Sequence, residues 1–180
     1  AQVVGPGVVE AVSSLASRAS GRRLPAWSAG LPRAGRPPTR DDAEPELVLF
    51  SSCTGRVLGA PRGAAPTTAA EAFLQVAARA GVGVRAPALP GRCCGLPFLA
   101  KGFPEARTLA MTRLVRDLWR WTDEGRMPVV VDASSCAYAL RRGADALTHP
   151  DDRARLAALR VRHPAEALRD LLPRLKVRRI

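Results

Sequence analysis

The sequence is poor in aromatic residues, in lysine and in cysteine, and it contains no long apolar run. Aromatic side chains make up 4% of the 180 residues. No stretch approaches the ~20 apolar residues that a membrane-spanning helix needs, so we expect no transmembrane segment. The first residues also lack the charged and apolar regions of a signal peptide. We therefore expect a cytoplasmic protein, or one held at the membrane periphery by its partners.

Lysine is scarce although the chain is strongly basic. Only Lys101 and Lys176 are lysines among the 28 basic residues, and the formal net charge is +12. Such a charge is typical of nucleic-acid-binding proteins. The arginines are dispersed, however, with no run longer than two, and aromatic residues are not interleaved with them as a stacking platform requires. We expect a solvated arginine surface, or one facing an acidic partner, and no nucleic-acid binding.

Four cysteines are too few for a disulfide scaffold in a chain of this length. Without a secretion signal, metal binding or redox chemistry is a better explanation for them than structural bridges. The alternative for any one of them is a small buried apolar side chain.

Short apolar runs alternate with amphipathic segments in the middle of the chain. Residues 47–50, 82–86 and 128–132 have the continuous apolar pattern of buried strands, and helices are expected over 66–80 and 104–121. This alternation predicts βαβ units and a mostly parallel sheet. The expected fold class is therefore α/β, with three layers, helices on both faces of the sheet and an irregular linker before it.

Three regions follow from this pattern. Residues 1–45 hold a helix over 4–19 and a linker rich in Pro, Gly and Arg. Residues 46–145 form a cysteine-rich α/β domain, whose last helix is expected over 137–142. Residues 146–180 are connecting segments, with helices expected near 152–157 and 164–172 and strands near 159–162 and 175–180.

Each cysteine lies just beyond a predicted strand. Cys53 follows the first strand, Cys93 and Cys94 follow the second, and Cys136 follows the third. Parallel strands end at the same edge of the sheet, where open α/β sheets place their ligands. Each cysteine also precedes a helix, whose N-terminal partial positive charge favours thiolate over thiol. The four thiols are therefore expected to meet at one edge as thiolates.

The loop around the cysteine pair contains residues suited to supporting such a site. Gly95 allows the backbone to turn tightly behind two adjacent side chains, and Pro97 stiffens the exit of the loop. Arg92 and Lys101 flank the pair and would offset the negative charge of a thiolate-ligated cluster.

Other polar residues have simpler explanations. His149 and His163 both precede prolines, so we expect turn or helix-boundary residues and not metal ligands. Asp132 is expected to cap the segment after its strand, and Ser52 to stabilise a turn.

The cysteine motifs resemble those of a known family. Cys93-Cys94-Gly95-Leu96-Pro97-Phe98, then Lys101-Gly102-Phe103 and Val131-Asp132-Ala133-Ser134-Ser135-Cys136, resemble the CCG (cysteine-rich) domain. That domain occurs in heterodisulfide reductase subunits and in the iron–sulfur part of glycolate and lactate oxidases. The chain is most similar to the C-terminal half of FAD-linked D-lactate dehydrogenase-type proteins, over about residues 46–142.

The resemblance implies a function. The chain would be the first CCG unit of a flavin-linked oxidoreductase acting on a 2-hydroxy acid such as D-lactate or glycolate. The four cysteines would hold an iron–sulfur cluster (4Fe-4S) that accepts electrons from FAD. The supporting residues would be Arg92, Gly95, Pro97, Lys101, Gly102 and Ser135.

The resemblance also implies partners. These are the flavin and ferredoxin-like domains of the same protein and a second CCG unit, none of which lies in this sequence. As a fragment of an FAD/iron–sulfur dehydrogenase, the chain is not expected to turn over substrate alone.

One departure from the family pattern keeps alternatives open. The fuller pattern ends Cys-x-x-Cys, whereas Ala139 follows Cys136 at that spacing. Four thiolates suit either a cubane cluster or tetrahedral zinc, which some family members hold, and an isolated segment could also carry neither. The alternative function is a non-catalytic module, stabilised by zinc or by packing, that docks an acidic partner.

Overall fold

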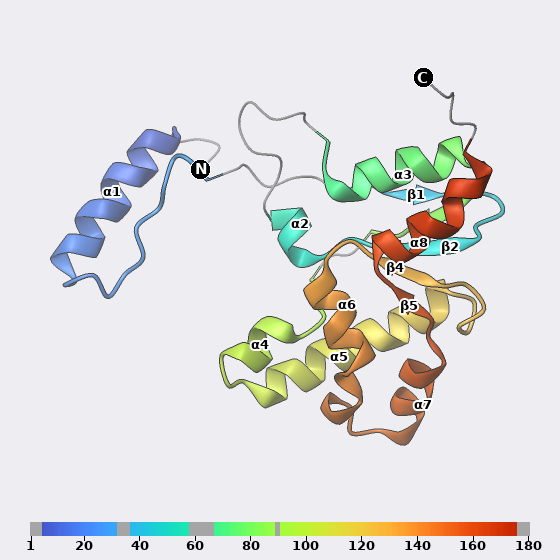
Figure 1. Ribbon diagram of the computed structural model, residues 1–180. Helices are drawn as coiled ribbons and strands as arrows, with labels where there is room; N and C mark the ends of the chain where they lie inside the picture. The colour runs from blue at the N-terminus through green and yellow to red at the C-terminus, as the bar shows by residue number, and fades with distance from the viewer. Residues whose placement is uncertain (1–4, 32–36, 58–66, 89–90, 176–180) are drawn as a thin grey trace.

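The computed structural model describes residues 5–31, 37–57, 67–88 and 91–175. It confirms the expected α/β class, with helices around a mostly parallel sheet (Figure 1). Neighbouring strands follow the order β1-β3-β2-β4-β5, and only β1 runs antiparallel to its neighbour. The strands are β1 (Arg40–Asp41), β2 (Leu47–Phe50), β3 (Val84–Ala86), β4 (Val129–Val131) and β5 (Val161–Arg162).

Helices cover both faces of this sheet. Figure 1 shows α3 and α8 on one face and α4, α5, α6 and α7 on the other, as the three-layer prediction requires. The helices are α1 (Pro6–Ala19), α2 (Cys53–Val57), α3 (Ala69–Arg79), α4 (Leu96–Ala100), α5 (Pro104–Trp121), α6 (Ser134–Arg141), α7 (Pro150–Ala158) and α8 (Pro164–Leu171). Two 3₁₀ turns, η1 (Gly143–Ala146) and η2 (Leu172–Arg174), complete the described elements.

The central strands are buried on both sides, which explains their continuous apolar sequences. Leu47 and Leu49 of β2 belong to the core under α3 and α8, whereas Phe50 belongs to the core with α5 and α6. Val130 and Val131 of β4 divide between the two cores in the same way. This alternation is the period of two that a strand imposes on its side chains.

Successive strands are added on opposite sides of β2. The chain passes from β2 through α3 to β3 on one side, and then through α5 to β4 on the other. Because such crossovers are right-handed, the two moves place α3 and α5 on opposite faces. The C-terminal ends of β3, β2 and β4 are therefore neighbours at a topological switch point, where open sheets bind ligands.

Local signals in the sequence fix several helix starts. Thr68 and Glu71 form a capping box at α3. His149 and His163 are the N-cap residues of α7 and α8, and the Nδ1 atom of each accepts a backbone hydrogen bond from two residues onward. The prediction that both histidines mark helix boundaries is confirmed.

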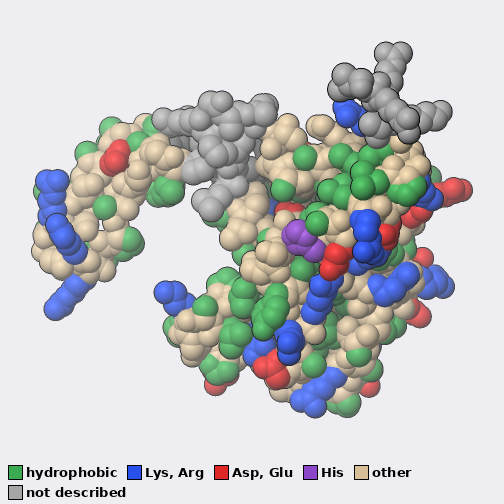
Figure 2. Space-filling model, viewed as in Figure 1, with side chains coloured by type: hydrophobic (Ala, Val, Ile, Leu, Met, Phe, Trp, Pro, Cys, Tyr) green, Lys and Arg blue, Asp and Glu red, His purple; other side chains and the backbone are tan. Residues whose placement is uncertain are grey.

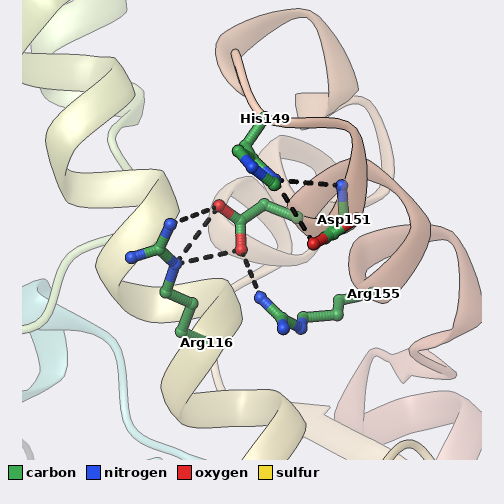
Figure 3. Close-up of polar contacts among 5 residues, drawn as sticks. Arg116, His149, Asp151 and Arg155 are labelled. Atoms are coloured by element: carbon green, nitrogen blue, oxygen red, sulfur yellow. Dashed lines mark hydrogen bonds and ion pairs between the residues drawn. The ribbon is translucent and has the colours of Figure 1, made fainter.

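A buried carboxylate joins α5 to α7. The side chain of Asp152 is 1% exposed and is held between Arg116 on α5 and Arg155 on its own helix (Figure 3). The Arg116 Nη2–Asp152 Oδ2 distance is 2.9 Å, and the Arg155 Nη1–Asp152 Oδ1 distance is 2.8 Å. The pair with Arg116 connects α7 to α5.

Several elements differ from the sequence-based expectations. Strand β1 lies inside the segment expected to be an irregular linker, because its backbone pairs with the edge strand β3. Helix α2 forms where no helix was expected, and α4 lies within the predicted loop around the cysteine pair. Helix α6 begins three residues before the predicted start at 137. The strand expected over 175–180 falls almost wholly outside the described residues.

Helix α1 lies to one side of the sheet (Figure 1). None of its residues, all of which the structure describes, is buried. The segment after it folds back, since the Trp27 backbone amide donates to Ser13 Oγ at 2.8 Å. The α1 region is therefore not part of either core.

The basic side chains are dispersed over the surface, as their distribution in the sequence suggests. Figure 2 shows Lys and Arg side chains scattered over the visible face and not gathered in one patch. Among the described residues, no helix is long and apolar enough to cross a membrane.

Candidate functional site

The four cysteines come from three loops at one edge of the sheet. Cys53 begins α2 just after β2, and Cys136 lies in the first turn of α6 just after β4. Cys93 and Cys94 lie between β3 and α4. The parallel register of these strands places all three loops at the switch point, as predicted.

Two of the four thiols share a hydrogen bond, and all four influence one another's pKa values. Cys94 donates a hydrogen bond to Cys136, with 3.1 Å between the two Sγ atoms, and both side chains are buried. The thiols of Cys94 and Cys53 both influence the pKa of Cys93. Cys53 and Cys93 are partly exposed. We call these four side chains the thiol row.

Gly95 makes the turn behind the cysteine pair, as predicted. It has a φ of +80° and is the N-cap residue of α4. A Cβ at this position would lie 3.2 Å from the backbone oxygen of Arg107 on α5. Its backbone amide donates to Cys93 Sγ at 3.4 Å. The glycine thus allows the loop to approach α5 while orienting the first thiol of the pair.

Asp132 has a role that the sequence did not reveal. The expected cap is wrong, because the α6 N-cap is Ala133 and has no side-chain hydrogen bond. Asp132 Oδ1 instead accepts a hydrogen bond from the Ser52 backbone amide at 2.6 Å. Gly55 lies close beside it, and a Cβ there would lie 2.9 Å from Asp132 Oδ2. Ser52 stabilises the turn as expected, its Oγ accepting from the Gly55 amide.

Arg56 is a cationic neighbour of the row that the sequence-based expectation did not include. Arg92 forms an ion pair with Asp117 on α5, which neutralises its charge locally. Burial raises the pKa of Cys53, and the positive charge of Arg56 on α2 opposes part of that rise. Arg56 also donates to the Arg92 carbonyl oxygen and so joins two of the cysteine loops. Its position one helical turn from Cys53 was the available sequence signal.

The remaining predicted supporting residues lie on exposed positions. Pro97 is in the first turn of α4, and Lys101 is its exposed C-cap residue. Gly102 follows with a φ of +75°. Ser135 is exposed in the first turn of α6.

A lowered thiol pKa, expected at all four cysteines from the helix N-termini, is found only at Cys136, and its cause there is a neighbouring thiol. The hydrogen bond accepted from Cys94 lowers the pKa of Cys136. The same hydrogen bond raises the pKa of Cys94 to about 11. The interaction with Cys94 raises the pKa of Cys93, and burial raises the pKa of Cys53. Burial and neighbouring thiols therefore outweigh the helix termini at three of the four positions.

The chemistry of the thiol row fits a soft metal, but its spacing is that of contacting thiols. Thiolates select zinc or iron. A tetrahedron with metal–sulfur bonds of ~2.3 Å has sulfur–sulfur edges of ~3.8 Å, compared with 3.1 Å between Cys94 and Cys136. Among the described residues, no group of three or more Cys, His, Asp or Glu side chains has the arrangement of a metal site. Metal binding would therefore require the sulfur atoms to move apart.

Comparisons with known proteins return no match to this chain, whether with protein-family models, curated proteins or solved structures.

Proposed function

We propose that this chain is the electron-transfer segment of a flavin-linked oxidoreductase acting on a 2-hydroxy acid, and that Cys53, Cys93, Cys94 and Cys136 hold its iron–sulfur cluster. The observation that carries the proposal is the convergence of four thiols from three loops at one sheet edge. The resemblance of the same loops to CCG domains supplies the redox partner, a flavin in another domain.

The surroundings of the row support a thiolate-ligated centre. Two of the four thiols are buried, so a metal there would be shielded from water on one side. The partly exposed Cys53 and Cys93 leave the other side open to a partner domain. A cluster bound there would accept and release single electrons, and the residues of this chain would supply its ligands and its dielectric environment.

A second function is favoured by the short sulfur spacing. The sulfur atoms around a single zinc ion lie closer together than those that bind four different irons of a cubane. The 3.1 Å contact between Cys94 and Cys136 is therefore nearer to the zinc arrangement. In that case the chain would be a non-catalytic module whose loops are fixed by zinc and whose arginine-rich surface binds an acidic partner.

Anaerobic reconstitution separates the two functions. The chain would be incubated with iron and sulfide, and in parallel with zinc, and then freed of excess metal. Bound metal and visible absorbance would be measured beside a Cys93→Ser, Cys94→Ser double variant. A cluster gives a broad band near ~400 nm and about four irons per chain, both lost in the double variant.

The alternative results are equally distinct. One tightly bound zinc and no colour after iron and sulfide treatment would support the zinc module and exclude the electron-transfer role for this chain. Equal iron binding by the native chain and the double variant would contradict both functions, because the cysteine pair would then not be a ligand.

A further inference from the structure

We propose that Cys94 and Cys136 form a reversible intramolecular disulfide in the metal-free chain. The two sulfur atoms lie 3.1 Å apart and already share a hydrogen bond. A disulfide bond is ~2.05 Å long, so closure requires an approach of ~1 Å. This inference goes beyond the proposed function, because it concerns the thiols themselves and needs no metal.

The fold brings this pair together across a long stretch of sequence. Cys94 belongs to the loop after β3, and Cys136 belongs to α6 after β4, 42 residues later. Both belong to the core cluster that contains Met111, Leu114 and Leu118 of α5. Both side chains are buried in that core, so packing restricts their relative position.

The other pairings in the row are less suitable for a stable bond. Cys93 and Cys94 are adjacent, and neighbouring Cα atoms lie ~3.8 Å apart, below the ~4.4–6.8 Å span of ordinary disulfides. Cys53 and Cys93 are both partly exposed and lie on α2 and on a loop outside helices, so neither is fixed by core packing. Cys94 and Cys136 are therefore the pair whose sulfur atoms are close and whose side chains are held by core packing.

A peroxide is the oxidant that suits buried thiols, since hydrogen peroxide is scarcely larger than water. Cys136 Sγ, which accepts the hydrogen bond, attacks one peroxide oxygen. The O–O bond breaks, water leaves and Cys136 becomes a sulfenic acid. Cys94 Sγ then attacks the Cys136 sulfur, the S–O bond breaks and a second water leaves. Two thiols and one peroxide thus give one disulfide and two waters.

Closure would also prevent metal binding. A disulfide between Cys94 and Cys136 removes two of the four ligands, so the oxidised chain could not load a cluster or zinc until it is reduced. This consequence rests on the proposed function, whereas disulfide formation does not. Counting thiols and locating the bond in the metal-free chain therefore tests disulfide formation by itself.

The test treats the metal-free, fully reduced chain with one equivalent of hydrogen peroxide. Free thiols are then titrated under denaturing conditions, and trypsin fragments are analysed by mass spectrometry without reduction. Trypsin separates residues 41–56 with Cys53, 93–101 with Cys93 and Cys94, and 127–141 with Cys136. A Cys53→Ser, Cys93→Ser double variant is the matched control, because it keeps only the proposed pair.

The expected result is a fall from four free thiols to two per monomeric chain, restored by dithiothreitol. Fragment 93–101 should be joined to 127–141, in the native chain and in the Cys53→Ser, Cys93→Ser variant alike. Cys94→Ala and Cys136→Ala variants, checked for folding by circular dichroism, should not form this link. Unchanged thiols in the Cys53→Ser, Cys93→Ser variant would overturn the proposal, as would a native product joining 41–56 to 93–101.

Discussion

The Ser52 backbone amide donates a hydrogen bond of 2.6 Å to the carboxylate of Asp132, across the ends of two neighbouring parallel strands. This hydrogen bond joins the segment that leads into Cys53 to the segment that leads into Cys136. Ser52 is almost fully buried, so its amide has no ready access to water. The carboxylate therefore satisfies a backbone donor that the sheet itself leaves unpaired.

Removing this carboxylate should destabilise the fold and loosen the thiol row. We expect Asp132→Ala to lower the free energy of unfolding by about 1–3 kcal/mol, because a buried donor loses its partner. Urea denaturation measures this change. Asp132→Asn keeps an oxygen acceptor and should lose less, so equal losses in the two variants would contradict the role given to the hydrogen bond.

A side chain at Gly95 should destabilise the fold for two separable reasons. Gly95 and Gly91 both have positive φ angles, but only Gly95 faces a neighbour, the Arg107 backbone on α5. We expect Gly91→Ala to cost about 1 kcal/mol from the left-handed conformation alone. Gly95→Ala should cost about 2–3 kcal/mol, since backbone strain and steric contact add. Urea midpoints compare the two variants, and equal losses would contradict the close approach to α5.

The buried Asp152 should contribute more to stability than an exposed ion pair of the same kind. Asp152→Asn should lower the free energy of unfolding by about 1.5–3 kcal/mol, because Arg116 and Arg155 lose a charged acceptor. The matched control is Asp145→Asn, whose carboxylate is 67% exposed in its pair with Arg107. That variant should lose less than about 1 kcal/mol. An equal loss at both sites would contradict the importance of burial.

The same carboxylate should make stability depend on pH in the acid range. Hydrogen bonds from Arg116 hold the pKa of Asp152 below its ordinary value of 3.8. The unfolded chain then binds the proton more readily than the folded chain, so stability rises with pH in this window. The contribution is fully present above pH 3.8 and is lost as pH falls through the folded pKa. The stability difference between the native chain and Asp152→Asn should therefore be constant near neutrality and shrink below pH 4.

The N-terminal helix should be dispensable for folding. No residue of α1, which the structure describes throughout, is buried, whereas Arg40 and Asp41 pair with β3. A chain shortened to begin at residue 37 should unfold with the same thermal midpoint as the full chain. A further deletion through Asp42 should lower that midpoint, because it exposes the edge of β3. A lower midpoint after the first deletion alone would show that α1 packs on the sheet in solution.

Much of the fold could be predicted from local sequence patterns. The apolar runs of β2 and β4 are continuous because both faces of these strands are buried. Helix α5 spans Pro104–Trp121 as predicted, since proline marks its start and its apolar stripe persists to its end. Strand β1 could not be predicted, because two charged residues have no apolar pattern and only pairing with β3 makes them a strand.

The candidate site shows where sequence reasoning ends. The position of the cysteines at one edge of the sheet could be predicted, because each cysteine comes just after a predicted strand. The Asp132–Ser52 hydrogen bond could not be predicted, because it depends on β2 and β4 being neighbours in the sheet. The thiol pKa directions also depend on which sulfur atoms touch, and helix N-termini alone gave the wrong direction for Cys53, Cys93 and Cys94.

The central claim is that the four thiols share one metal centre. X-ray absorption at the metal edge of the reconstituted chain tests it most directly, because it counts the atoms bound to the metal and measures their distances. The account predicts sulfur ligands at ~2.3 Å, with the cysteine-derived signal lost in the Cys93→Ser, Cys94→Ser variant. A first shell of oxygen or nitrogen, or a spectrum unchanged in that variant, would contradict it.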